Sequence, residues 1–193
     1  MLQFRCMDSL FHALVGAMIG EIAPKSIKRR RLKGALAAMS PDLMNIPSYL
    51  YLGIKTNSTL WYPQPDAFYQ NPWITEHWTW LCWNMSHSFL FWGLIIMPLV
   101  IRSKWTPLFG IAYLSHLILD LPSHSGIWSV QPIWPYGWLA EGWFDAWAWN
   151  LRQIFTYSTL PAFCWFLAYR MRLQKWIVWP SERQNAHAEV IRG

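Results

Sequence analysis

The sequence predicts an all-α protein: a polytopic membrane helical bundle of about five membrane helices joined by Trp-rich interfacial loops. Three observations predict it. Only 13% of the 193 residues are charged, against roughly 25% in a typical soluble domain. Hydrophobic residues make up 54%. The chain also holds 16 tryptophans, and Trp favours the membrane–water interface. We expect one membrane-embedded domain over residues 1–181 and a polar tail over 182–193.

Three uncharged apolar runs are expected to span the bilayer, and two weaker segments precede them. Residues 78–101 are long enough to cross, whereas 105–119 and 153–169 need their flanks or a tilt. Residues 10–24 and 32–52 are predicted to form half-buried or short spanning helices.

Glycine and proline mark special positions in the two weaker segments. Gly16 and Gly20 have a Gly-x-x-x-Gly spacing, which predicts close helix packing. Pro41 is expected to break its helix, so that Asp42 projects from the break.

The connecting segments 53–77 and 121–149 are rich in Pro, Tyr and Trp and are predicted to be interfacial loops. Six tryptophans of the second loop are expected at head-group level, around the entrance to a site. They are Trp128, Trp134, Trp138, Trp143, Trp147 and Trp149.

The basic residues predict the orientation. If five helices alternate from an outside start, 13 of the 16 Lys and Arg fall on the cytoplasmic side. This bias predicts an integral plasma (inner) membrane protein with its N-terminus outside and its C-terminus cytoplasmic. The net charge of +6 is concentrated in the run 25–33, which indicates a membrane anchor and not a nucleic-acid surface.

A polar stripe interrupts one of the apolar segments. His116, Asp120 and His124 stand at intervals of four, which places them on one face of a helix. Ionisable groups are costly in a bilayer, so we expect partners for them.

The partners are predicted from depth. With a rise of 1.5 Å per residue, ionisable groups of four segments lie roughly 13–24 Å from their nearest cytoplasmic basic anchors, in the outer half of the bilayer. A single buried His is usually a hydrogen-bonded core residue, but several such groups at one depth favour a shared polar site. That site comprises His12, Asp42, His87, His116 and Asp120.

The residue types of this site indicate a metal. Three imidazoles and two carboxylates suit a borderline divalent ion, zinc first and then manganese or iron. The three cysteines have no metal-type spacing. Because a carboxylate can bridge two ions, we expect two, which together activate water and clamp a phosphoryl group.

Five short motifs carry a resemblance to a known family. In chain order, "FHALVGAMIGE", "MSPDL", "NMSHSF", "HLILD" and "IWPYG" resemble the predicted inner-membrane metal-dependent hydrolases, often called YdjM-like, from about residue 8 to 140. That family is similar to the zinc-dependent phospholipase C and nuclease fold, which is all-helical.

The resemblance implies a role for each residue. His12 would bind one ion, His87 and His116 the other, and Asp120 would bridge them, while Asp42 would orient or deprotonate the attacking water. The soluble enzymes hold a third ion with a further His and a His-x3-Glu pair, and no His-x3-Glu occurs here. His124 is expected at the mouth of the site.

The resulting expectation is a hydrolase that acts on a phosphoester, such as a lipid head group, at the extracytoplasmic face. One alternative is a non-catalytic membrane protein that binds haem through His87 and His116, although Asp120 suits haem poorly. Another is a metal transporter or scaffold, which would need a polar path that the run "GLIIMPLVI" does not offer. The chain contains no H-E-x-x-H and no G-x-S-x-G.

Overall fold

The computed structural model describes residues 8–58, 61, 63, 65–103 and 106–183. Within these ranges the regular secondary structure is helical, and no strand is formed. A single isolated antiparallel bridge joins Val130 and Ala140. The predicted all-α class is therefore confirmed. Residues 184–193 of the expected tail and the start of segment 105–119 lie outside the described residues.

Nine α-helices follow one another along the described chain, with short 3-10 turns and one π-helical turn (Trp92–Ile96) between them. The helices are α1 (Asp8–Ile22), α2 (Arg30–Leu43), α3 (Ile46–Lys55), α4 (Pro65–Gln70), α5 (Leu81–Ser86), α6 (Phe89–Phe91), α7 (Met97–Arg102), α8 (Pro107–Ser123) and α9 (Leu151–Leu173).

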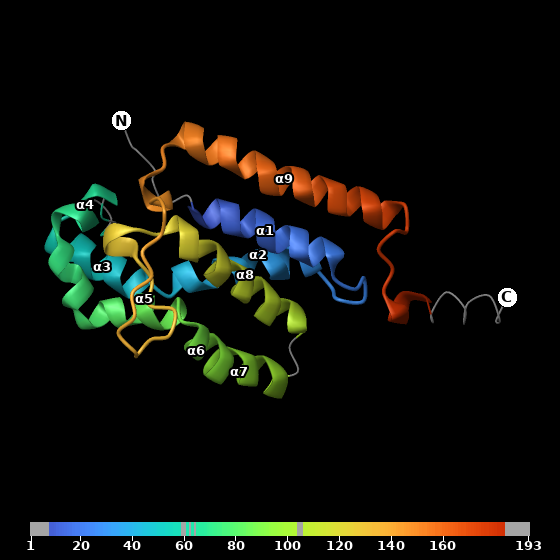
Figure 1. The fold of residues 1–193 in the computed structure, drawn as a ribbon, viewed down its shortest axis with the longest axis horizontal. Coiled ribbons are helices and arrows are strands. Elements are labelled where there is room, and N and C mark those ends of the chain that lie inside the picture. Colours follow the sequence, from blue (N-terminus) through green and yellow to red (C-terminus); the bar gives the residue numbers. More distant parts are fainter. Residues whose placement is uncertain (1–7, 59–60, 62, 64, 104–105, 184–193) are drawn as a thin grey trace.

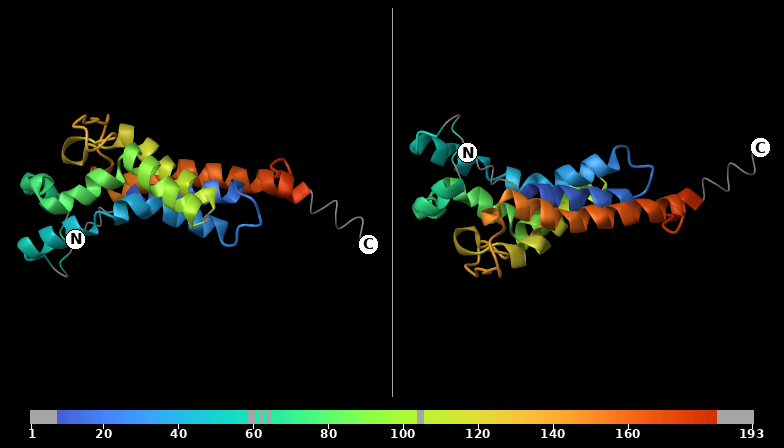
Figure 2. Two further views of the ribbon diagram at one scale, coloured as in Figure 1. Left: turned by 90° about the horizontal axis from the view of Figure 1, so that it is seen from below. Right: turned by 90° about the horizontal axis from the view of Figure 1, so that it is seen from above.

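Helix α1 forms the centre of the bundle. It packs against α2, α9 and α8, and α2 also packs against α8. Figure 1 shows the long helix α9 along the outer side of α1, with α3, α4 and α5 gathered at one end of the molecule. The two further views show the same elongated shape, with the loop between α1 and α2 near the end of α9 (Figure 2).

Glycines set the distance between α1 and α2. A Cβ added at Gly16 would lie 2.2 Å from the carbonyl oxygen of Gly34, and one at Gly20 would lie 2.4 Å from that of Arg30. Only glycine permits backbones to approach this closely. The predicted close packing of Gly16 and Gly20 is therefore confirmed, and it draws α1 and α2 together beside the site.

The expectation that Pro41 breaks its helix is wrong, because α2 continues to Leu43. Proline has no N–H to donate to the carbonyl of Ala37, four residues earlier. The hydroxyl of Ser40 donates to that carbonyl at 2.7 Å instead. Asp42 therefore projects from the last turn of an intact helix.

The segment 78–101, expected as a span, is not one straight helix. Its two helical parts, Trp78–Ser86 and Phe89–Arg102, are bent by 70°. Ser88 causes the break: its extended backbone ends the first part, and its Oγ accepts hydrogen bonds from the N–H groups of Leu90 and Phe91 to cap the second.

Across the described residues, no single helix is both long and apolar enough to cross a bilayer; only the bent pair passes that test, by length and composition. The expected segment 32–52 is likewise divided, between α2 and α3. The remaining segments correspond to α1, α8 and α9.

Aromatic side chains form the core at the end that carries α3, α4 and α5. Trp128 and Trp147 are buried and stack at 4.6 Å between ring centroids. They pack in a cluster that includes Phe68, Trp80 and Trp83. The expectation of head-group positions is thus wrong for Trp128 and Trp147, because the segment after α8 folds back over this core.

Candidate metal centre

The structure brings all five predicted site residues together from four parts of the chain. Helix α1 supplies His12, α2 supplies Asp42, the residue after α5 is His87, and α8 supplies His116 and Asp120. Asp42 is 8% exposed and the other four are 2% exposed or less.

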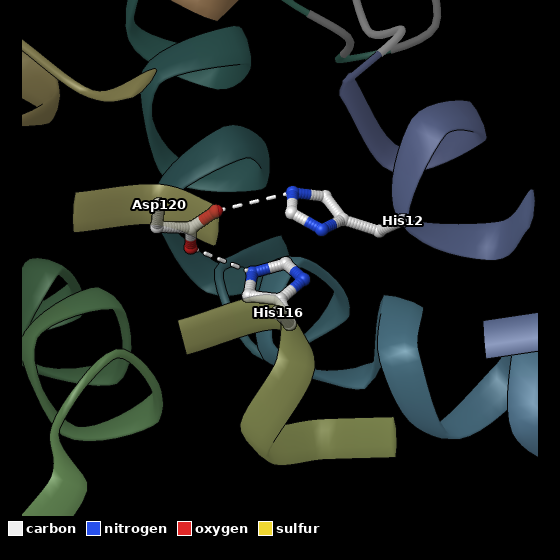
Figure 3. Close-up of side chains that lie close together, drawn as sticks. All are labelled: His12, His116 and Asp120. Carbon is white, nitrogen blue, oxygen red and sulfur yellow. Dashed lines mark ion pairs between the residues drawn. The ribbon is translucent and has the colours of Figure 1, made fainter. Parts of the chain in front are cut away.

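The Asp120 carboxylate lies at the centre of this group and divides the histidines into two sets. Its Oδ1 lies 3.1 Å from Nε2 of His12. Its Oδ2 lies 2.9 Å from Nε2 of His116 and 3.3 Å from Nε2 of His87. Figure 3 shows the carboxylate directed at both the His12 and the His116 rings. His12 therefore contacts Oδ1 of Asp120, whereas His87 and His116 contact Oδ2.

Backbone carbonyls fix the proton position on two of the rings. The Nδ1 of His116 lies 2.6 Å from the carbonyl oxygen of Ala38, and that of His87 lies 3.0 Å from the carbonyl oxygen of Trp83. Because a carbonyl only accepts, each Nδ1 carries the hydrogen. In the neutral rings both Nε2 atoms then present a lone pair, which is the arrangement of metal-ligating histidines.

Lone pairs and carboxylates that face each other repel unless a cation lies between them. The Nε2 atoms of His87 and His116 are 3.2 Å apart, and carboxylate oxygens surround them. A proton or a metal ion relieves this repulsion, and the mixed imidazole and carboxylate donors are those of zinc and similar ions. The residues present therefore fit a divalent metal.

Two overlapping groups of ligand atoms are close enough to hold an ion. Each offers three atoms within 4.8 Å of one another. One group is His12, His116 and Asp120, and the other is Asp42, His87 and His116. His116 belongs to both.

Asp42 lies at the outer edge of the centre. Its Oδ1 is 3.6 Å from Nε2 of His116 and 3.7 Å from Nε2 of His87. Its Oδ2 accepts a hydrogen bond from the half-buried Ser9 hydroxyl at 2.7 Å. Sequence reasoning missed Ser9, although its spacing of three from His12 places both on one face of α1.

His87 is held on three sides at the bend between α5 and α6. Its ring stacks on Trp83 with 3.7 Å between centroids, and Ser86 Oγ lies 2.9 Å from its Nδ1. The hydroxyl of Tyr113, on α8, donates to the carbonyl of Ser86 at 2.7 Å. The bend thus aims Nε2 of His87 at α8.

The expectation that His124 lies at the mouth of the site is wrong, because its side chain is fully buried. The indole N–H of Trp147 donates to its Nε2 at 2.7 Å. Its Nδ1 is 3.0 Å from Ser123 Oγ and 3.6 Å from Asp120 Oδ1. His124 therefore lies behind Asp120, at ion-pair distance from its Oδ1. Sequence reasoning missed the part that Trp147 has in holding His124.

The geometry does not favour haem. Two histidines on opposite sides of a haem iron need the porphyrin plane between them. The Nε2 atoms of His87 and His116 are too close for that, and their rings are tilted by 54° with centroids 5.2 Å apart.

Comparison with protein-family models, curated proteins and solved structures finds no match for this chain.

Proposed function

We propose that the protein is a membrane-bound metal-dependent hydrolase that cleaves a phosphoester, such as a lipid head group, at the extracytoplasmic face. One observation carries the proposal: backbone carbonyls fix His87 and His116 as Nδ1–H tautomers, whose Nε2 lone pairs face the buried carboxylates of Asp120 and Asp42. The proposal agrees with the resemblance to the YdjM-like hydrolases.

The donor set supports up to two ions, with zinc as the first choice. His12 and Oδ1 of Asp120 would hold one, while His87, His116 and Oδ2 of Asp120 would hold the other. When bound, such ions act as Lewis acids that lower the pKa of water and neutralise phosphoryl oxygens.

The chain's own residues would supply the proton transfer and the positioning. Oδ1 of Asp42 is buried and faces the Nε2 atoms of His87 and His116, so it would accept a proton from a water held inside the centre. Ser9 orients Asp42 through Oδ2. On the far side, His124 holds Asp120, and the aromatic cluster beneath them excludes water.

The outer surface supports a membrane location. Large apolar side chains are more than half exposed on five helices, which exceeds what scattered surface residues explain. They include Leu36 on α2, Ile54 on α3, Leu99 on α7, Ile118 on α8 and Phe163 on α9.

The distribution of charge supports the proposed orientation. The basic loop between α1 and α2 lies beside the end of α9: the Lys25 N–H donates to Glu182, and Arg172 donates to the carbonyl of Ala23. Figure 1 shows this basic end opposite the end that carries α3 and α4. We therefore propose that the N-terminus is outside and the C-terminus is in the cytoplasm.

Paired metal analysis and turnover test the function. Detergent-purified protein is assayed for bound metal and for hydrolysis of bis(4-nitrophenyl) phosphate, together with His116→Ala and His77→Ala. We expect His116→Ala to bind less metal than the wild type and to lose turnover. His77 stacks on Tyr51 outside the centre, so His77→Ala should retain both. Wild-type protein without stoichiometric metal would contradict the proposal.

Reporter fusions test the orientation independently. A reporter fused after Gly193 should behave as cytoplasmic, and one inserted at Asn57 as external. A cytoplasmic position for the segment 53–77 would contradict the outward-facing site while leaving the metal centre itself intact.

A further inference from the structure

A cavity of about 660 Å³ lies next to the metal centre but is not part of it. It is open to the outside and is lined by Phe11 of α1, the segment 144–149 and the N-terminal half of α9. Its volume is in the range of small-molecule sites. Phe11 separates it from the centre, with its ring edge-on to His12 at 6.2 Å between centroids.

Four aromatic rings line this cavity, and Trp149 is the one that contacts the other three. Phe144 stacks on Trp149 at 5.7 Å with an interplanar angle of 12°. Tyr157 lies 4.6 Å from it, and Phe11 lies 6.4 Å from it at 72°. Phe144 and Trp149 are thus nearly parallel, whereas Tyr157 and Phe11 are turned by 47° and 72° against Trp149. Rings of different orientation therefore border one space, as in the aromatic cages that hold quaternary ammonium groups.

A carboxylate lines the same space. Asp145 accepts a hydrogen bond from the N–H of Trp147 at 2.9 Å, and the Tyr69 hydroxyl donates to its other oxygen. Burial raises the pKa of Asp145, and these two hydrogen bonds oppose the rise. Arg152 lies on the first turn of α9, next to the lining residue Gln153, but it is exposed and does not line the cavity. The charge of the cavity wall is therefore negative.

We propose that this cavity binds a small organic cation of the alkylammonium class, between the faces of the aromatic rings and the Asp145 carboxylate. The ring faces carry negative electrostatic potential and the carboxylate supplies a full charge, so both favour a cation over a neutral molecule of equal size. The inference rests on the cavity alone and goes beyond the proposed hydrolase.

Calorimetric titration of the full chain in maltoside micelles tests the proposal with two probes of the same shape. Choline carries the charge, and 3,3-dimethyl-1-butanol is its uncharged isostere. We expect choline to bind at least about tenfold more tightly than the alcohol. Equal binding of the two probes, or no binding of choline, would overturn the proposal.

Three variants locate the binding. Asp145→Asn and Trp149→Leu should each weaken choline binding by about tenfold, and Trp143→Leu, which removes an 89% exposed indole, should leave it unchanged. Unaltered choline binding in Asp145→Asn and Trp149→Leu would overturn the assignment. Bound metal, measured on the same samples, should stay at the wild-type level, so this test and that of the hydrolase fail separately.

Discussion

Buried carboxylates occur at both ends of this molecule, and their partners differ in one respect. At the basic end, Glu21 is 1% exposed. Its carboxylate accepts a hydrogen bond from Arg30 at 2.9 Å and one from the Trp165 indole, and it pairs with Arg31. At the other end, Asp120 faces the Nε2 atoms of His87 and His116, which carry no hydrogen when the rings are neutral.

The protonation of the partner distinguishes a structural ion pair from a ligand site. Arginine is always protonated and offers fixed N–H donors, so Glu21 is complete without any additional group. An imidazole whose Nδ1 hydrogen is given to a backbone carbonyl offers only a lone pair. A carboxylate among such rings needs an added cation, although both carboxylates are equally buried.

The largest effect should come from Asp120, which touches both sets of histidines. Asp120→Ala should remove all bound metal and lower turnover by at least about 10³-fold. Elemental analysis of the purified variant provides the measurement. Retention of the wild-type metal content would disprove the bridging role.

Asp42→Asn should separate binding from chemistry. The change keeps the size of the side chain but removes the basic oxygen, and a general base commonly contributes about 10²–10⁴-fold in rate. We expect turnover to fall by that factor with metal content near normal. Loss of metal would instead identify Asp42 as a ligand, a role that its position beside His87 and His116 also permits. Unchanged turnover would show that another residue is the general base.

Glu21→Gln should act on stability and not on metal. The neutral amide leaves Arg30 and Arg31 without a counter-charge, which we expect to cost about 2 kcal/mol of unfolding free energy, since Arg31 is half exposed. Thermal unfolding measures the loss, and metal content should equal that of the wild type. A variant that loses metal would show that the two ends are coupled.

Trp147→Phe should have the smallest effect. It removes the indole N–H that orients His124. A hydrogen bond made directly to a metal ligand is worth about 10–100-fold in metal affinity, and because His124 only lies behind the ligand Asp120, we expect the affinity to fall by about tenfold or less. Competition with a zinc chelator gives that affinity. An affinity equal to that of the wild type would show that His124 does not support Asp120.

Features that depend on helical spacing were accessible from the sequence. The four-residue interval places His116 and Asp120 on one face of α8, and Gly16 and Gly20 do pack closely. The Ser88 cap that bends the segment after α5 also has a local signal, a serine directly before the next helix.

Features that depend on contacts distant in sequence were not accessible. His124 is buried because Trp147, 23 residues later, covers it, and the Gly142 N–H donates to the His124 carbonyl at 2.7 Å. No periodic pattern in the sequence predicts that the segment 142–147 folds back onto His124. Pro41 stays within α2 because Ser40 replaces the lost donor, which depends on one side-chain rotamer.

The protonation state of His87 and His116 in metal-loaded protein decides whether these residues bind a metal, and ¹⁵N NMR of the imidazole rings measures it. We predict that both rings carry hydrogen on Nδ1 only, with Nε2 shifts typical of metal coordination that vanish on chelation. Doubly protonated rings, unaffected by metal removal, would show that protons fill the gap between the lone pairs and the carboxylates, and would contradict the metal centre.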